Sequence, residues 1–140
     1  MKKQANVIAV LRQIADENDG ILMPEKVVEA ARPASSILHS KFEWNNSKAA
    51  QAFRLWQARQ LIRVCVEFIP QSKRATEVFV SLTPDRKSGG YRVQTEVLSD
   101  RQMLAQLLAD ALAELELFRQ KYARLKELAA VFAAIRRVRK

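Results

Sequence analysis

Hydrophobic positions recur at helical spacing through the first half of the chain. A first helix is expected over residues 4–17, where apolar side chains return every three or four positions before an Asn-Asp-Gly turn. A second is expected over residues 24–31, because proline suits the first position of a helix. Residues 35–42 have room for one further short turn. Asn45, Asn46 and Ser47 offer N-caps for a strong third helix that runs to about residue 63.

The period of the pattern then changes from helical to extended. Residues 63–69 and 76–82 are short and rich in β-branched and aromatic side chains, which predicts two strands. Residues 70–75 connect them, so we expect an antiparallel hairpin with a basic tip. Residues 83–90 combine a proline with two glycines and predict a loop, and residues 91–97 are expected to add a third extended segment.

From Ser99 onward the chain contains neither glycine nor proline. Ser99 followed by Gln102 fits a capping box, which predicts a helix that runs to about residue 138. Apolar side chains recur there at alternating steps of four and three, as in a heptad seam. The larger members of this seam are Leu104, Leu108, Leu115, Phe118, Tyr122, Leu125 and Phe132.

The expected length of this helix limits how it is covered. A helix of about 36–40 residues would span roughly 55–60 Å at about 1.5 Å per residue. A domain of about 100 residues, with a radius of gyration near 13 Å, is too small to cover it. Either the helix bends back near residues 119–121, or a second chain covers the rest. We favour self-association, with a dimer as the simplest assembly, over a two-helix hairpin within one chain.

These elements predict an α+β fold that is mostly α. A winged-helix-like part, with three helices followed by a β-hairpin, is expected over residues 1–98. A long helix or helical hairpin with a basic tail, serving oligomerisation, is expected over residues 99–140.

The net charge of the chain indicates which class of partner it binds. The chain has 140 residues and a formal net charge of +9, from 24 Lys and Arg against 15 Asp and Glu. Residues 101–140 hold nine basic and four acidic side chains, so the excess is largest there. Such an excess favours a polyanion, most often nucleic acid. A merely solubilising surface is the alternative.

The expected winged-helix order gives the basic residues positions for DNA binding, with the third helix in the major groove and the hairpin tip on the backbone. The expected phosphate contacts come from that helix, the tip and the tail: Lys48, Arg54, Arg59, Arg63, Lys73, Arg74, Arg136, Arg137, Arg139 and Lys140. One objection is that apolar residues surround much of the third helix. A core helix whose arginines extend to solvent is therefore the alternative.

Other candidate chemistry is weaker. Phe42 and Trp44 would suit a stacking platform for unpaired bases, although an aromatic pair before a helix more often fixes the angle of entry. Asp85 and Lys87 match half of a nuclease metal site, but they lie in the expected loop. The chain has one histidine, His39, and one cysteine, Cys65. We therefore expect no enzymatic activity, no metal and no cofactor.

Several segments resemble small proteins encoded by temperate bacteriophages and prophages. They are residues 24–33 (PEKVVEAARP), 38–44 (LHSKFEW), 49–63 (AAQAFRLWQARQLIR) and 89–92 (GGYR), and the similarity continues into the C-terminal helix. The resemblance implies a protein of the bacterial cytoplasm. It supplies no catalytic or binding residues. DNA binding, accessory work in recombination or replication, and inhibition of a host system all fit such proteins.

The sequence also predicts the cellular location of the chain and its binding partners. The apolar run after the basic start is broken by Arg12 and Gln13, so no signal peptide is expected. No stretch approaches the roughly 20 apolar residues needed to span a bilayer. The expected partners are DNA and a second copy of the chain, with no membrane. Protein–protein interaction with a host factor through the C-terminal helix is the alternative.

Overall fold

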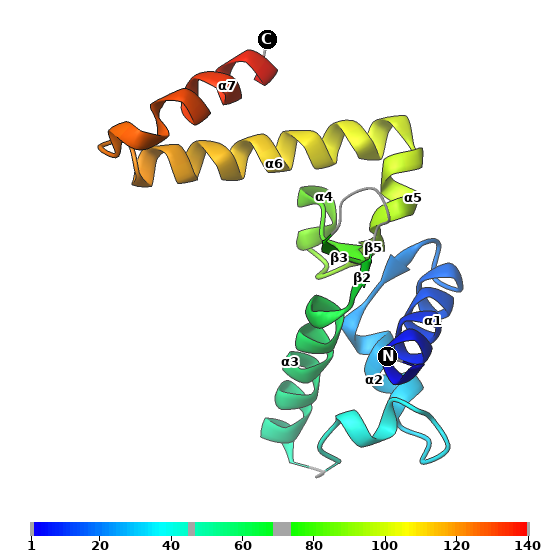
Figure 1. Ribbon diagram of the computed structural model, residues 1–140. Coiled ribbons are helices and arrows are strands. Elements are labelled where there is room, and N and C mark those ends of the chain that lie inside the picture. Colours follow the sequence, from blue (N-terminus) through cyan, green and yellow to red (C-terminus); the bar gives the residue numbers. More distant parts are fainter. Residues whose placement is uncertain (1, 45–46, 69–73, 140) are drawn as a thin grey trace. The chain divides into compact units, whose positions relative to one another are not determined.

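The computed structural model describes residues 2–44, 47–68 and 74–139 and divides the chain into two units, Met1–Val97 and Leu98–Lys140 (Figure 1). The fold is α+β and mostly α, as predicted. Each unit is described by itself.

The first unit begins with helices and continues with short strands. Its helical elements are α1 (Lys2–Asp16), α2 (Pro24–Ala31), the 3-10 turn η1 (His39–Lys41), α3 (Lys48–Val64) and α4 (Thr83–Arg86). Its strands are β1 (Ile21–Leu22), β2 (Val66–Phe68), β3 (Ala75–Glu77), β4 (Phe79–Val80) and β5 (Tyr91–Val93), and α5 (Gln94–Ser99) follows. The three expected helices and the hairpin β2–β3 are therefore present in the expected order.

The strands form two small antiparallel sheets. β2 pairs with β3, with Val66 opposite Glu77, while the other sheet has the order β1-β5-β4. The predicted strand over residues 76–82 divides at Val78, whose N–H donates to the carbonyl of Cys65 and whose carbonyl accepts from Gln94 N. Val78 is buried, so it belongs to the core while the chain passes from one sheet to the other. Arg63, expected to begin a strand, lies in α3.

The core of this unit is formed by the apolar faces of α1, α2 and α3 and by residues of the sheets. Leu11, Val27 and Leu22 are fully buried, and Ile62 contributes from α3. Their burial follows the helical spacing of the sequence, since positions three or four apart lie on one face. This packing holds α1, α2 and α3 together and leaves one face of α3 outside the core.

The sequence pattern predicted that Cys65 lies in a strand, and this is wrong. Cys65 is the C-cap of α3. Its side chain is buried, and its Sγ donates to the carbonyl oxygen of Leu61 at 3.2 Å. Burial raises the pKa of the Cys65 thiol to about 11. The thiol therefore stays protonated at neutral pH, which is the state expected of a small core residue.

The segment predicted as a loop over residues 83–90 contains the short helix α4 and a tight turn. Asp85 is buried and accepts two hydrogen bonds from Arg92, at 2.6 Å from Nε and 3.1 Å from Nη2. At Gly90 an added Cβ would lie 2.7 Å from Ile21 Cγ2, so a side chain there would collide with β1. The turn and the ion pair fix β5 between β1 and β4.

The second unit is a helical hairpin, not one continuous helix. α6 (Arg101–Lys121) ends at Tyr122, η2 (Lys126–Leu128) follows, and α7 (Ala129–Arg139) packs against α6. The N-cap of α6 is Asp100, whose Oδ1 accepts from Met103 N, so the capping box expected at Ser99 is wrong. The helix expected to reach residue 138 is also wrong. α6 ends at Lys121, so the chain turns just after residues 119–121, where the alternative to self-association placed a bend.

Candidate nucleic-acid interface

The helix α3 has one face in the core and one face in solvent. Ser47 caps its N-terminus by accepting from Ala50 N at 3.1 Å. Ala58 and Ile62 lie in the core, and Leu55 and Leu61 are partly buried against it. Phe53, Trp56, Arg63 and Val64 are exposed on the other side, and Arg59 is half-buried. Of the apolar residues that surround much of this helix, Phe53 and Trp56 face solvent, so α3 is less buried than its sequence pattern indicated.

Two arginines and an aromatic pair share this exposed face. With 3.6 residues per turn, Trp56, Arg59 and Arg63 lie within about 60° of one another, and Phe53 lies about 60° beyond Trp56. The helix contains no acidic residue. Neither Arg59 nor Arg63 forms an ion pair with another described residue. We call the four residues Phe53, Trp56, Arg59 and Arg63 the α3 face.

The aromatic pair of the α3 face was not singled out as a site from the sequence. The rings of Phe53 and Trp56 stack with centroids 5.6 Å apart and an interplanar angle of 15°. Their exposed fractions are 46% and 52%, which is large for side chains of this type. The three-residue spacing of the rings predicts their contact, but only the packing of α3 against the core shows that they face solvent.

Arg54 does not belong to this interface, which corrects its assignment as a phosphate contact. It is buried, with an exposed fraction of 4%. Its guanidinium donates to the carbonyl of Glu43 at 3.1 Å and to Oε1 of Gln51 at 2.8 Å. It also lies over the ring of Trp44, 5.4 Å from the centroid. Arg54 therefore joins α3 to the segment before it.

Phe42 and Trp44 are structural as well. Phe42 is buried, and Trp44 stacks on His39 with centroids 4.9 Å apart. The indole Nε1 of Trp44 donates to the carbonyl of His39 at 2.8 Å. His39 Nδ1 lies 2.9 Å from the carbonyl of Ala31. These contacts hold η1 against α2, which agrees with the structural role that the sequence favoured for this aromatic pair over a stacking platform.

Most of the remaining expected phosphate contacts belong to other elements than α3. Arg74 is exposed at the end of the described hairpin. Arg136, Arg137 and Arg139 are exposed in the last turn of α7. Lys73, Lys140 and the side chain of Lys48 lie outside what the structure describes. The cations of the second unit form a group of their own.

The tail of α7 is tied to α6 by one shared carboxylate. Glu116 accepts from Arg119 Nε at 3.0 Å, and Arg139 Nη1 lies 3.7 Å from Glu116 Oε2. The hydrogen bond from Arg119 and the attraction of both guanidiniums keep the pKa of Glu116 below its ordinary value. Arg139 is therefore partly engaged within the hairpin, while Arg136 and Arg137 have no ion pair with another described residue.

The expected oligomerisation seam is divided by the hairpin. Leu104, Leu108 and Leu115 form an exposed row on α6. Phe118 contacts Tyr122 and Phe132 of its own chain, with ring centroids 4.8 and 6.4 Å away. Phe132 is buried, and Leu125 lies in the turn between the helices. A continuous seam through Phe132 is therefore wrong, although the row on α6 remains uncovered within its unit.

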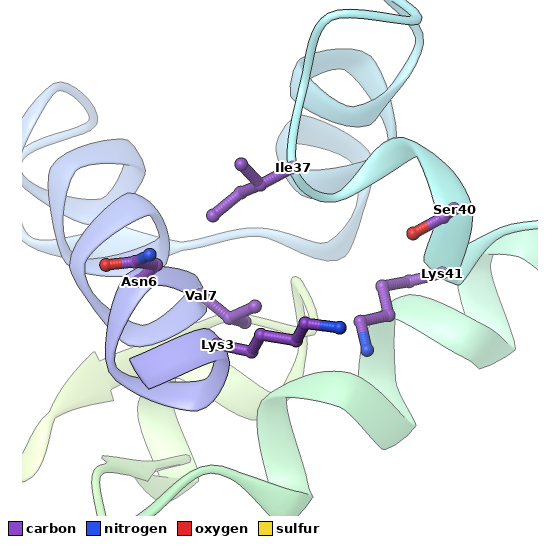
Figure 2. A pocket seen from close by; sticks show the side chains of 6 residues that line it. All are labelled: Lys3, Asn6, Val7, Ile37, Ser40 and Lys41. Atoms are coloured by element: carbon purple, nitrogen blue, oxygen red, sulfur yellow. The ribbon is translucent and has the colours of Figure 1, made fainter. Parts of the chain in front are cut away.

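One further hollow lies between α1 and η1, with a cavity of about 270 Å³ (Figure 2). Lys3 and Asn6 line it from α1 and Ser40 and Lys41 from η1, with Val7 and Ile37 as its apolar wall. Figure 2 shows the amino groups of Lys3 and Lys41 approaching each other across the hollow. Neither forms an ion pair with another described residue. Two such cations would suit one small anionic group.

The residues proposed for metal chemistry have other partners. Asp85 is held by Arg92, and Lys87 is exposed after α4. Among the described residues, no group of three or more His, Cys, Asp or Glu side chains is placed to hold a metal ion. None of the helices in the described ranges combines the length and the apolar character that crossing a membrane requires.

Comparisons with protein-family models, with curated proteins and with solved structures found no match. The likeness to phage proteins and the winged-helix-like assignment therefore stay predictions.

Proposed function

We propose that this chain is a non-enzymatic DNA-binding protein that uses the α3 face as its main contact. The observation that carries the proposal is that half-buried Arg59, exposed Arg63 and the exposed, stacked aromatic pair share one face of a helix without acidic residues. Long cationic side chains on a rigid helix can reach several phosphates at once, because the helix is held from behind by the core.

The order of elements supports the same proposal. α3 precedes the hairpin β2–β3, as the recognition helix precedes the wing in winged-helix proteins, and Arg74 lies at the described edge of that hairpin. Arg136 and Arg137 add a second cationic group at the end of α7. In this proposal α3 positions the DNA, and the hairpin and the tail contribute further phosphate contacts.

Salt dependence tests this proposal directly. Affinity for a DNA oligonucleotide would be measured by fluorescence anisotropy between about 50 and 200 mM salt. If about six phosphates are engaged, log affinity should fall against log salt with a slope near −5, because each contact releases condensed counterions. A slope near zero, or no binding at the lowest salt, would reject the proposal.

Self-association through α6 is part of the same proposal. Leu104, Leu108 and Leu115 are 42%, 50% and 39% exposed and lie on one side of the helix. Their spacing of four and seven residues is that of a coiled-coil seam, which favours a second copy of this chain as the occupant. A dimer would double the number of cationic sites on one DNA molecule and so raise the avidity.

Replacing Leu108 and Leu115 together by Asp is expected to convert a dimer into a monomer, because each chain would have to bury two carboxylates in the interface. Light scattering at several protein concentrations measures the change. Replacing exposed Ala113 and Leu117 by Asp gives a control on another side of α6. A monomeric parent protein, or dissociation by the control alone, would contradict self-association through this row.

A second candidate function uses the same row for a different protein, such as a host factor. The exposure of this row is equally consistent with binding of a different protein. The two candidate functions differ in which substitutions abolish them. If a partner protein is the target, Leu108→Asp with Leu115→Asp abolishes function while changes of Arg59 and Arg63 leave it intact. The resemblance to phage proteins, with the bacterial cytoplasm as the location, is compatible with either candidate.

A further inference from the structure

We propose that the α3 face binds unpaired bases, so that the DNA it takes is single-stranded. In this proposal one or two bases stack on the Phe53–Trp56 pair while Arg59 and Arg63 contact the neighbouring phosphates. The inference rests on the proposed function, because it specifies which form of nucleic acid occupies the same face.

The aromatic pair has the geometry of a stacking surface. Its rings are nearly parallel, at 15°, and each leaves about half of its surface in solvent. Both residues lie within α3, whose inner face is packed in the core, so the rings are presented by a rigid element. A base can extend such a stack on its free side, because every base has an aromatic face.

The cations lie where the backbone of a stacked strand would pass. Arg59 follows Trp56 by three residues and Arg63 follows Arg59 by four, so successive members are about one helical turn, or roughly 5–6 Å, apart. Arg59 is half-buried and Arg63 exposed, and neither has an ion pair with another described residue. The combination of aromatic faces with nearby cations is what sequence-tolerant single-strand binding uses.

A duplex would leave the aromatic pair without a matching partner. In double-stranded DNA the base faces are stacked on one another, and a helix in the groove meets only base edges, methyl groups and phosphates. Arginines suit those groups, but two stacked rings would lose water without gaining a stack. Unpaired bases offer both faces and phosphates, so they match all four residues of the α3 face.

A protein partner matches this face less well. Protein interfaces are enriched in aromatic residues and in Arg and depleted in Lys, Asp and Glu, so the choice between the two kinds of partner depends on charge complementarity. Here Arg63 projects within about 20° of Trp56 around the helix, and α3 offers no carboxylate to pair with it. The charge complementarity therefore favours a polyanion that also carries aromatic groups.

Tryptophan fluorescence provides the test, because the chain has only two tryptophans, Trp44 and Trp56. The Trp44→Phe protein reports on Trp56 alone. It would be titrated with a thymidine oligonucleotide, which cannot pair with itself, and with a duplex of equal phosphate concentration. Stacking predicts quenching of the Trp56 emission by the single strand and little change with the duplex. The matched Trp56→Phe protein, which reports on Trp44, should show little change with either.

Affinities separate stacking from charge. Trp56→Leu, which keeps an apolar side chain, is expected to weaken single-strand binding by about 10-fold and duplex binding by less than about 2-fold. Arg59→Ala with Arg63→Ala should weaken both. Because Trp44 contacts the core, circular dichroism first checks that Trp44→Phe is folded. If it is not, the difference in quenching between the parent and Trp56→Leu proteins gives the same information.

Each outcome has one meaning. Quenching by the single strand, together with the selective loss in Trp56→Leu, supports the proposal. Binding of both DNA forms without quenching overturns stacking but leaves the proposed DNA-binding function standing. Tighter binding of the duplex with equal loss in Trp56→Leu overturns the single-strand preference. Absence of binding to either form at low salt overturns this inference and the proposed function together, and points to a protein partner for the pair.

Discussion

Replacing Arg59 and Arg63 together by alanine is expected to weaken DNA binding by roughly 30- to 100-fold at low salt. Each guanidinium would contribute about 1–1.5 kcal/mol as a charge-assisted contact to phosphate, and about 1.4 kcal/mol corresponds to a tenfold change in affinity. The slope of log affinity against log salt should become shallower by about 2, because two fewer counterions are released. Fluorescence anisotropy with a labelled oligonucleotide measures both quantities.

A matched control separates the position of these charges from their number. Lys87→Ala with Arg101→Ala also removes two exposed positive charges, from residues outside α3. We expect this control to keep its affinity within about 3-fold at about 0.15 M salt, because charges that make no direct contact with the DNA are then largely screened. An equal loss in both variants would mean that net charge, and not the α3 face, determines binding.

Arg54→Ala is expected to lower the free energy of unfolding by about 2–4 kcal/mol. The substitution empties the buried space of the Arg54 side chain, leaves the carbonyl of Glu43 without this donor, removes the hydrogen bonds to Gln51 and takes a cation from the face of Trp44. A loss of this size is a large part of the stability of a small protein. Urea denaturation followed by circular dichroism measures it.

Arg59→Ala is the natural comparison, since it removes the same side chain five residues along the same helix. It should change the free energy of unfolding by less than about 0.5–1 kcal/mol, because Arg59 makes no ion pair with a described residue and is only half-buried. If Arg54→Ala were as stable as Arg59→Ala and instead lost DNA affinity, the division of α3 into a core face and a DNA face would be wrong.

Local signals predicted much of the fold of the first unit. The helix over residues 24–31 is confirmed because Pro24 at its first position and the apolar spacing of Val27, Val28 and Ala31 depend only on nearby residues. Ser47 caps α3 for the same reason. The division of residues 76–82 between two sheets was not predictable, since Val78 is fixed by hydrogen bonds to Cys65 and Gln94.

The second unit shows where local signals are insufficient. Residues 122–125 contain no glycine or proline, and the heptad spacing continues through them, yet the chain turns there. Phe132 and Ile135 of α7 are buried in the hairpin, and their packing against α6 favours the turn. The heptad pattern alone is equally compatible with packing against a partner chain and with packing against the next helix of the same chain.

The candidate site, too, was predicted only in part from local sequence signals. Composition and charge identified the basic residues of α3, Lys48, Arg54, Arg59 and Arg63, as candidates alike. Neither could show that Arg54 points inward to Glu43 while Phe53 and Trp56 point outward, because that depends on which side of α3 meets the core. The aromatic half of the site therefore came from tertiary packing.

Chemical-shift mapping by NMR tests most directly whether DNA occupies this side of the helix. The ¹⁵N-labelled protein would be titrated with a short thymidine oligonucleotide at low salt, with the indole signals of Trp44 and Trp56 followed separately. Binding at the α3 face predicts the largest shifts in residues 52–64 and at the Trp56 indole, with the Trp44 indole nearly unchanged. Shifts centred on α6, or spread evenly over exposed lysines and arginines, would contradict it.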